Sequence, residues 1–296
     1  MDHHRPTFPG ETAGDNPGAP AATTAATAAT AGTQVGAHQL SAVEVSLAYG
    51  QRTIIEGLSV DIRPGKVTSI IGPNGCGKST LLRSLSRLLA PTAGSIVLDG
   101  ADISRLPAKA LAQQLGLLPQ SPAAPDGIVV ADLVGRGRTP YQGLLGRWSQ
   151  RDYDIVAQAM ESTGTAQLAQ RSLDELSGGQ RQRVWIAMAL AQDTDILLLD
   201  EPTTYLDIRH QLEVLELLRA LNRERSTTIV MVIHDLNLAA RYSDELIAVA
   251  DGHIVAQGPP VDTLTPQTVR DVFGIDSIVI DDPVSGLPAV MPIGAI

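Results

Sequence analysis

Residues 72–79 read Gly-Pro-Asn-Gly-Cys-Gly-Lys-Ser and match the phosphate-binding pattern G-x-x-x-x-G-K-[ST] at every fixed position. Glycines allow backbone N–H groups to approach phosphate oxygens closely, and a helix that begins after the loop presents its positive end to them. Lys78 is expected to reach the β- and γ-phosphates, and Ser79 to bind Mg²⁺. The pattern therefore predicts a nucleoside triphosphate site, whose other residues are Gly72, Pro73, Asn74, Gly75, Cys76, Gly77 and Thr80.

A strand before this loop and a helix after it must position the loop. The apolar run Val67–Ile71 leads directly into the loop and is typical of a short buried strand. Beyond the loop, leucines recur at the three- and four-residue spacing of one helix face, at positions 81, 82, 85, 88 and 89. The alternative, a glycine-rich turn that fits the pattern by chance, leaves both flanking elements unexplained.

Two carboxylates, Asp200 and Glu201, directly follow the apolar run 196–199. Ligand sites in open α/β sheets lie beyond the carboxyl ends of the strands, which is where this pair is expected. Asp200 is suited to hold the Mg²⁺ shell, and Glu201 to polarise the water that attacks the γ-phosphate. The alternative is that both residues simply cap the turn formed by residues 202–204.

A second glycine-rich segment, Leu-Ser-Gly-Gly-Gln at residues 176–180, precedes another helical pattern. Ser177 and Gln180 stand at the spacing of a capping box. Gly178 and Gly179 at the start of the helix permit close approach of the backbone to phosphate, which predicts a second anion site. An ordinary capped helix is the alternative.

The chain divides by composition into a folded part and two tails. Residues 1–37 consist largely of Ala, Thr, Gly and Pro, have little to bury and are expected to be a disordered tail. The folded domain is expected over residues 38–276. Residues 277–296 carry no motif and are assigned to a carboxy-terminal tail.

Within the folded domain, alternating apolar residues before residue 100 predict an antiparallel β subdomain. Residues 121–180 contain several prolines and glycines between helical patterns, and are expected to be a helical insertion; Ser149 and Asp152 have capping-box spacing there. Apolar runs at 196–199 and 228–233, separated by helical stretches, predict a mostly parallel core sheet. The expected fold class is therefore α/β.

Composition restricts the class of partner. The net charge of −10 argues against a broad nucleic-acid surface, so no nucleic-acid partner is expected. No run approaches the roughly 18 apolar residues of a membrane-spanning helix. The amino end lacks the pattern of a secretory signal, and the single cysteine excludes an internal disulfide, so a cytosolic location is expected.

The order of these elements, followed by His234 after the run 228–233, resembles the ATP-binding subunits of ABC transporters over about residues 40–276. This resemblance implies a head-to-tail dimer, in which the phosphate loop of one copy and the Ser177 loop of the other enclose each ATP. It also implies that Tyr49 stacks on adenine and that His234 contacts the γ-phosphate. Gln120 would sense Mg²⁺ and couple to a membrane partner, and Asp207 would lie in a segment that contacts the other copy.

The residues alone leave plainer interpretations open for three of these positions. Tyr49 could be an aromatic residue of an edge strand, and Gln120, after Pro119, could be a polar loop residue. His234 ends an apolar run, and a single histidine in such a place is commonly structural.

Three classes of ABC protein share this nucleotide chemistry. Chromosome-structure and DNA-repair members separate the two glycine-rich segments by a long coiled coil, and no heptads occur between Lys78 and Ser177. Translation-associated members generally carry two cassettes, whereas this chain has one. The expected role is thus that of the ATPase of an importer on the cytoplasmic face of the membrane. Separate permease subunits are the expected partners, and an extracytoplasmic binding protein would deliver the cargo to them.

The helical insertion indicates a cargo. Residues 134–141, Val-Gly-Arg-Gly-Arg-Thr-Pro-Tyr, and the Gly-Arg-Trp at 146–148 are similar to the iron-siderophore importer group, which handles ferric enterobactin, ferrichrome and ferric citrate. The plainer interpretation of this region is a generic basic loop facing solvent. Departures such as Tyr141 leave cobalamin or haem import open, and a soluble ABC ATPase without a transport role is the alternative from a different class.

Overall fold

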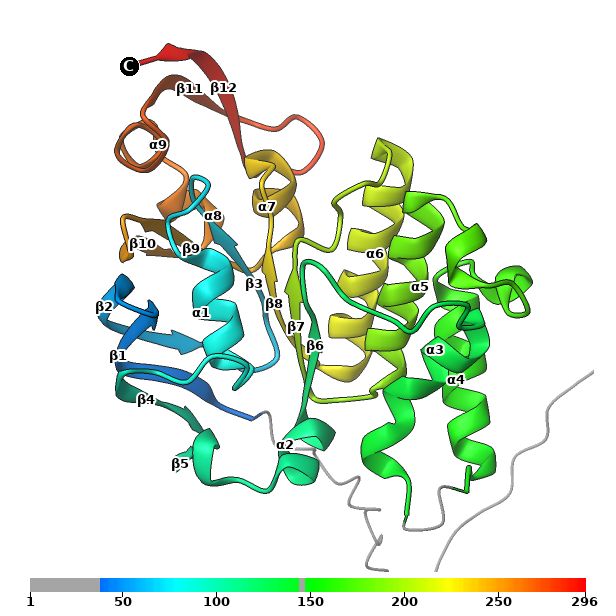
Figure 1. Cartoon of the computed structure of the whole chain (residues 1–296). Coiled ribbons are helices and arrows are strands. Elements are labelled where there is room, and N and C mark those ends of the chain that lie inside the picture. Colours follow the sequence, from blue (N-terminus) through cyan, green and yellow to red (C-terminus); the bar gives the residue numbers. More distant parts are fainter. Residues whose placement is uncertain (1–37, 144–146) are drawn as a thin grey trace, which may run out of the picture. The chain divides into compact units, whose positions relative to one another are not determined.

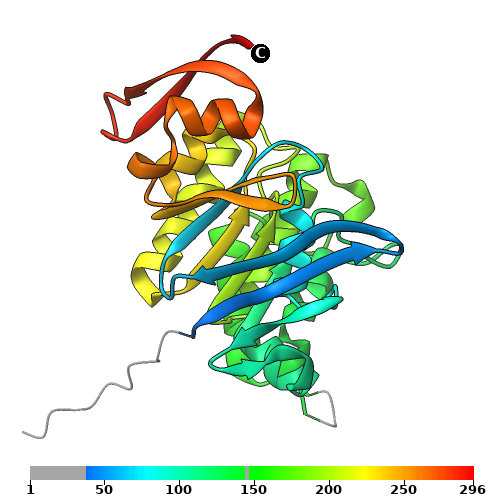
Figure 2. The same cartoon turned by 90° about the vertical axis from the view of Figure 1, so that its left-hand side faces the viewer.

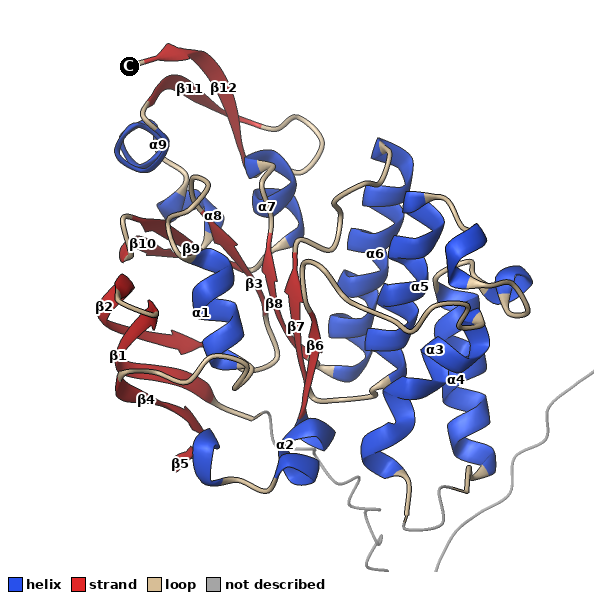
Figure 3. Ribbon diagram, viewed as in Figure 1, coloured by secondary structure: helices blue, strands red, loops and turns tan. Residues whose placement is uncertain are grey.

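The computed structural model describes residues 38–143 and 147–296. The tail predicted at 1–37 and Gly146 of the insertion motif lie outside these described residues. Among the described residues, no helix is both long and apolar enough to cross a membrane. The folded unit contains an antiparallel sheet, a mostly parallel sheet and a group of helices. Figure 3 colours the strands red and the helices blue.

The central sheet has six strands, and its four adjacent pairs from β9 to β6 are parallel. In spatial order the strands are β10 (His253–Gly258), β9 (Glu245–Ala250), β3 (Val67–Ile71), β8 (Thr228–Val232), β7 (Ile196–Asp200) and β6 (Leu115–Leu118). Every residue of β3, β7 and β8 is buried, as expected for strands covered on both faces. The predicted parallel sheet is confirmed, and a hairpin joins β9 to the antiparallel edge strand β10.

The predicted amino-terminal antiparallel sheet is also confirmed. Its strands, in spatial order, are β2 (Arg52–Ile62), β1 (Leu40–Tyr49), β4 (Ala93–Leu98) and β5 (Ala101–Asp102). Figure 2 shows β1 and β2 running side by side as the longest strands of this sheet. Their inward side chains join one apolar cluster with residues of β3, β7, β8 and β9, so the two sheets share a core.

Helix α1 (Lys78–Leu85) contributes Leu81, Leu82 and Leu85 to this shared core, and all three are fully buried. The helix is shorter than the leucine spacing suggests. Arg87 adopts a left-handed backbone conformation with φ 62°, and the N–H of Leu88 donates to the carbonyl of Arg83, which is a Schellman ending. Leu88 therefore lies beyond the helix and is 63% exposed.

The opposite face of the central sheet is covered by helices that follow the second glycine-rich segment (Figure 1). These are α5 (Gly178–Ala191), α6 (Ile208–Arg225) and α7 (Leu236–Tyr242). The insertion packs on α5 through α3 (Val130–Gly135) and α4 (Gln150–Ser162), while α2 (Ala108–Gln114) precedes β6. Both side chains of the capping box predicted at Ser149 and Asp152 make their bonds at the start of α4.

The carboxy-terminal residues are ordered into regular structure. After α8 (Pro260–Thr263) and α9 (Pro266–Phe273), β11 (Ile275–Asp281) and β12 (Pro288–Ala295) form an antiparallel hairpin. The side chain of Asn237 in α7 bonds both the N–H and the carbonyl of Val290. The boundary placed between residues 276 and 277 thus falls inside β11, because these backbone bonds and buried Val290 attach the segment to the domain.

The basic turn of the insertion, the 3₁₀ turn Arg136–Tyr141, does not face solvent throughout. Arg138 is only 2% exposed, and its Nε donates to Oδ1 of Asp152 at 2.9 Å. Its guanidinium carbon lies 3.8 Å from the centre of the Tyr141 ring. The interpretation of this region as a generic solvent-facing loop is therefore wrong for Arg138, because its charge is paired inside the domain.

Replacing Asp152 with alanine should lower the free energy of unfolding by about 3–5 kcal/mol at neutral pH, because the Arg138 guanidinium would remain buried without its carboxylate. Hydrogen bonds from Ser149, with a further one from Arg138, hold the pKa of Asp152 down at about 2. A carboxylate whose pKa is lower in the folded than in the unfolded chain stabilises the folded state. This stabilisation is complete above the unfolded-state pKa near 3.8 and is lost as the pH falls towards 2. Urea unfolding of the wild type and the variant, at neutral and at acid pH, measures the difference in the free energy of unfolding.

The control is Asp154→Ala, which removes an exposed carboxylate from the same helix that accepts only from Gln150. Equal urea midpoints for the two variants at neutral pH would show that the buried pair contributes nothing measurable.

Candidate active site

A hollow of about 490 Å³ lies where the phosphate-binding loop meets the carboxyl ends of β6 and β7 and the segment after β8. Five separate chain segments contribute to it. Its lining consists of Arg52, Ile54, Asn74, Gly75, Gly77, Lys78, Ser79, Thr80, Gln120, Glu201 and His234. The volume falls in the range typical of small-molecule sites.

Two glycines of the loop are required by its close packing. A Cβ on Gly72 would lie 2.1 Å from the carbonyl oxygen of Val249, so no side chain fits there. Gly77 has φ 109° at the amino cap of α1, a conformation that other residues rarely adopt. These two positions allow the loop to turn sharply from β3 into α1, and α1 then directs its free N–H groups into the hollow.

Lys78 begins α1 and is 5% exposed. Its Nζ donates to the carbonyl oxygens of Gly72 at 2.9 Å and Pro73 at 2.8 Å. Two carbonyl groups at the start of the loop therefore hold the ammonium group of Lys78 within the loop. None of its hydrogen-bond partners is a carboxylate, so the ammonium group remains available to an anionic ligand in the hollow.

Ser79 and Asp200 form a pair of oxygen ligands at the side of the hollow. The Ser79 hydroxyl donates to Oδ1 of Asp200 at 2.8 Å, while Oδ2 of Asp200 is buried and has no hydrogen-bond partner among the described residues. Burial, assisted by the neighbouring Glu201, raises the pKa of Asp200 despite the Ser79 bond. A hard divalent cation would satisfy both the unpaired oxygen and the desolvated charge.

The described residues contain no cluster of three or more His, Cys, Asp or Glu side chains able to cage a metal alone. Mg²⁺ does not need such a cluster, because it is usually coordinated by one or two protein oxygens, and phosphate and water fill its remaining coordination positions. The oxygen pair of Ser79 and Asp200 fits that ion.

Three polar side chains hold the carboxylate of Glu201. Oε1 lies 2.8 Å from Nε2 of Gln120, which donates to it, and 2.7 Å from Nε2 of His234; Oε2 accepts from the Thr204 hydroxyl at 3.1 Å. Burial alone would raise the pKa of Glu201, but these hydrogen bonds and His234 outweigh it and lower the pKa. Glu201 also has φ 55°, an uncommon conformation for a residue with a side chain and one that often marks functional sites.

The structure thus brings the phosphate loop, Asp200, Glu201, Gln120 and His234 together. Thr204 was known from sequence only as part of a turn, and its bond to Glu201 was missed. Arg52 and Ile54 were also missed, because they lie in β2 and carry no motif. Their only sequence signal is their place directly after the turn that follows Tyr49.

Tyr49 itself does not line the hollow. It pairs with Arg52 in the β1–β2 register, is 45% exposed, and its hydroxyl accepts from Arg83 at 3.2 Å. Tyr49 is therefore at the rim, one strand away from the lining.

The Ser177 loop and Asp207 do not line the hollow either. Ser177 and Gln180 make both bonds of the predicted capping box at the start of α5, and Asp207 caps α6. Added Cβ atoms on Gly178 and Gly179 would touch Tyr205 and Leu206, so the Ser177 loop lies against the segment that contains Asp207. Tyr205 and Ile208 are about four-fifths exposed, at 80% and 76%. A second, exposed group of residues therefore consists of Ser177, Gly178, Tyr205, Asp207 and Ile208.

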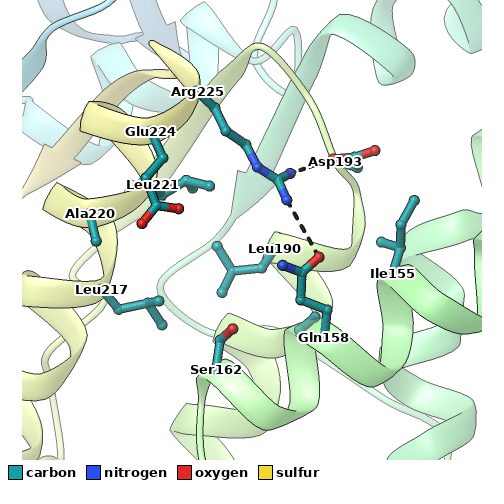
Figure 4. Close-up of a pocket in the computed structure, with 11 residues that line it drawn as sticks. Ile155, Gln158, Ser162, Leu190, Asp193, Leu217, Ala220, Leu221, Glu224 and Arg225 are labelled. Atoms are coloured by element: carbon teal, nitrogen blue, oxygen red, sulfur yellow. Dashed lines mark hydrogen bonds and ion pairs between the residues drawn. The ribbon is translucent and has the colours of Figure 1, made fainter.

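A further hollow of about 210 Å³ lies between α4, α5 and α6 and shares no lining residue with the first. Figure 4 shows its apolar floor, formed in part by Leu190 and Leu221, and Arg225 reaching across its rim. Arg225 donates to Oδ1 of Asp193 at 2.8 Å and to Gln158 at 3.4 Å. None of its lining residues belongs to the phosphate-binding loop.

Alkylation of Cys76 should be slow and should block nucleotide binding. Cys76 is 6% exposed, and burial raises the pKa of its thiol although Lys78 opposes this, so little reactive thiolate exists at neutral pH. A bulky adduct in the loop would occupy the space of a phosphate. Modification by N-ethylmaleimide, followed by mass spectrometry, and ATP binding measured on the modified chain test this.

Cys76 is the only cysteine, so Cys76→Ser provides a control that the reagent cannot modify. Full ATP affinity after complete modification would contradict the placement of Cys76 in the binding loop.

Comparison with known proteins agrees with this geometry. A family model described as "ABC transporter" matches residues 55–204. The achromobactin transport ATP-binding protein CbrD of Dickeya dadantii (strain 3937) is 52% identical over 255 residues, which cover 86% of this chain and 95% of that protein. The ferric enterobactin transport ATP-binding protein FepC of Escherichia coli (strain K12) is 52% identical over 256 residues, covering 86% and 94%.

Among solved structures, the dimeric structure of MJ0796, a bacterial ABC transporter cassette, superposes with a TM-score of 0.68 at 28% identity and covers 74% of this chain and 98% of that chain. The family model spans half of the sequence, and two relatives share more than half of their residues with it over nearly their whole length. This chain belongs to the ABC transporter family, as an ATP-binding subunit with ATPase activity.

Proposed function

We propose that this chain hydrolyses ATP to energise the import of ferric siderophores through a separate membrane permease. The observation that carries the proposal is the 52% identity, over nearly the full length of both, to subunits named for achromobactin and ferric enterobactin transport. The Arg136–Tyr141 turn, which is part of the motif at 134–141 that resembles this importer group, supports it.

In this proposal the phosphate loop binds the nucleotide and Glu201 acts as the general base. Gln120 and His234 hold Oε1 of Glu201 in place, at 2.8 and 2.7 Å, so the carboxylate has a fixed direction towards the hollow. A low pKa keeps Glu201 ionised and able to accept a proton from water. His234 would in addition contact the γ-phosphate, and Tyr49 at the rim would stack on adenine.

Ser79, Asp200 and Gln120 would hold Mg²⁺. Because Nε2 of Gln120 donates to Glu201, its Oε1 is the atom that can serve as a ligand. The ion supplies positive charge that offsets the charge developing on the phosphate oxygens. The protein contributes these oxygens and the ammonium group of Lys78, the residue next to Ser79.

The catalytic unit is proposed to be a head-to-tail dimer. The Ser177 loop and Asp207 form an exposed group that does not line the hollow of the same chain. Two capping-box glycines at a helix start remain suited to phosphate, so in this arrangement they would complete the ATP site of a second copy. The neighbouring exposed Tyr205 and Ile208 would then be covered.

The other proposed partners are permease subunits at the cytoplasmic face of the membrane and, indirectly, an extracytoplasmic siderophore-binding protein. The insertion would contact the permease. A stable contact is expected to bury at least about 1,200 Å² in total.

Uptake by a strain that lacks this chain tests the proposal. Labelled ferric enterobactin, ferric achromobactin, haem and cobalamin are compared side by side, with the wild-type chain and Glu201→Gln restored in parallel. Selective loss of ferric siderophore uptake, restored only by the wild-type chain, is expected. Selective loss of cobalamin or haem uptake would replace the cargo, and undiminished uptake of all four would remove the transport role.

A further inference from the structure

The carboxyl end of α5 is held by two side chains of the insertion, Arg138 and Tyr141. The last carbonyl groups of a helix have no partners within the helix and need other donors. Here Nη1 of Arg138 donates to the carbonyls of Ala191 at 2.9 Å and Gln192 at 3.5 Å, and the Tyr141 hydroxyl donates to that of Asp193 at 3.0 Å. The insertion thus supplies the donors that end α5.

Arg138 joins two antiparallel neighbours at this point. Its Nε donates to Asp152, whose other oxygen accepts from Ser149 and caps the start of α4, while its Nη1 caps the end of α5. The Tyr141 ring covers the guanidinium at 3.8 Å. One buried cation therefore fixes the start of α4 relative to the end of α5.

The end of α5 is also anchored to the core sheet independently of Arg138. The side chain of Gln192 accepts from the N–H of Leu117 at 3.1 Å and donates to its carbonyl at 3.3 Å, completing the outer edge of β6. A Cβ on Gly116 would lie 2.9 Å from this amide oxygen, so the strand closely contacts Gln192. The end of α5 is thus a fixed pivot on the sheet, and Arg138 determines how the insertion is attached to that pivot.

The other end of α5 carries the Ser177 loop. With 14 residues, the helix is about 21 Å long at 1.5 Å per residue, so a tilt of about 3° at the pivot moves Ser177 by about 1 Å. A misplacement of 1 Å can reduce a rate by about 10²-fold. Arg138 does not line the hollow, yet a small change of tilt at the pivot would shift the Ser177 loop.

We propose that Arg138 is a positioning residue for ATP hydrolysis: by joining α4 to the end of α5, it sets the angle at which α5 presents the Ser177 loop to the nucleotide held by a second copy. This inference rests on the shared site proposed above. It assigns Arg138 and Tyr141 of the insertion to the geometry of the ATP site.

Arg138→Lys tests the role in the full-length chain, because lysine keeps the charge but cannot bond Asp152 and two carbonyls at fixed angles. The kcat for ATP is expected to fall at least 10-fold, while equilibrium ATP binding to the phosphate loop changes less than 2-fold. Tyr141→Phe, which keeps the ring and removes only the hydroxyl, should lower kcat by about 3-fold without unfolding.

The matched control is Arg151→Lys, since Arg151 is 80% exposed in its side chain and reaches only the Asp193 carboxylate, at 3.5 Å. Its kcat is expected to equal that of the wild type. If Arg138→Lys and Tyr141→Phe both leave kcat unchanged, or if they weaken ATP binding as much as kcat, the positioning role is overturned.

Mixed dimers separate this inference from the shared site itself. One dimer pairs a Lys78→Ala chain with an Arg138→Lys chain; the other pairs the wild type with a chain carrying both substitutions. Single-turnover ATP hydrolysis should be at least 10-fold faster in the first dimer, because its one intact phosphate loop faces an intact Ser177 loop. Equal rates would overturn the role of Arg138, whereas a faster second dimer would overturn the shared site.

Discussion

Glu201→Gln should retain ATP binding but lose turnover by about 10²- to 10⁴-fold, the usual cost of removing a positioned base. Glutamine keeps the shape of the side chain, so Gln120 and Thr204 can still form hydrogen bonds with its amide group. It cannot accept the proton of the attacking water, however. The chain should therefore bind ATP and stop at a closed dimer, which steady-state ATPase assays and size-exclusion chromatography with ATP will measure.

The electrostatics of Glu201 add a pH dependence to this result. Burial tends to raise its pKa, but hydrogen bonds from His234, Thr204 and Gln120 lower it below the ordinary value of a glutamate. The base is therefore ionised throughout the neutral range, and any fall of the wild-type rate on the acid side between pH 6 and 7 cannot come from Glu201. A rate limb with a midpoint above pH 5 that disappears in Glu201→Gln would contradict this assignment.

Glu213→Gln is the matched control for Glu201→Gln, because Glu213 lies on α6 and pairs only with exposed Arg209. It should leave turnover within experimental error of the wild type. If Glu201→Gln also turns over at the wild-type rate, then Glu201 is not the base and Asp200 becomes the nearest carboxylate to test.

The parts of the site that could be predicted from sequence are those formed by residues close together in the chain. The phosphate loop, with Gly72 and Gly77, and the capping box of Ser177 depend on local backbone geometry, which fixes residue types at fixed spacing. The apolar strands β3, β7 and β8 were recognisable because burial on both faces removes the polar residues that would otherwise alternate. These elements in turn predicted that Asp200 and Glu201 would meet the loop.

Other features depend on contacts between distant segments, for which the sequence gives no local signal. The plainer interpretation of the insertion placed its basic residues in solvent, and nothing near Arg138 in the sequence shows that Asp152 and the carbonyls that end α5 bind its buried side chain. The β11–β12 hairpin was taken for a tail because the bonds from Asn237 that attach Val290 come from a helix about 50 residues earlier. Arg52 enters the hollow only because β2 pairs with β1.

Lys78→Ala should weaken ATP binding by about 10- to 100-fold, which corresponds to the loss of a hydrogen-bonding interaction with a charged group of roughly 1.5–3 kcal/mol. Its ammonium is buried in the loop and bonded to the carbonyls of Gly72 and Pro73 and, at 4.0 Å, to the sulfur of Cys76, so it can turn to phosphate oxygens without breaking an ion pair. Alanine removes the positive charge and keeps the start of α1 helical. Isothermal titration with ATP and ADP measures the change directly.

The two nucleotides separate the role of Lys78 from a general loss of the loop. If its ammonium reaches the β- and γ-phosphates, the loss in affinity should be larger for ATP than for ADP, because ADP lacks the γ-phosphate. Lys66→Ala is the control, since Lys66 is exposed at the other end of β3 and should leave both affinities unchanged. Equal losses for ATP and ADP would place the lysine at the β-phosphate alone, and unchanged affinity for both would mean that this loop does not hold the nucleotide through Lys78.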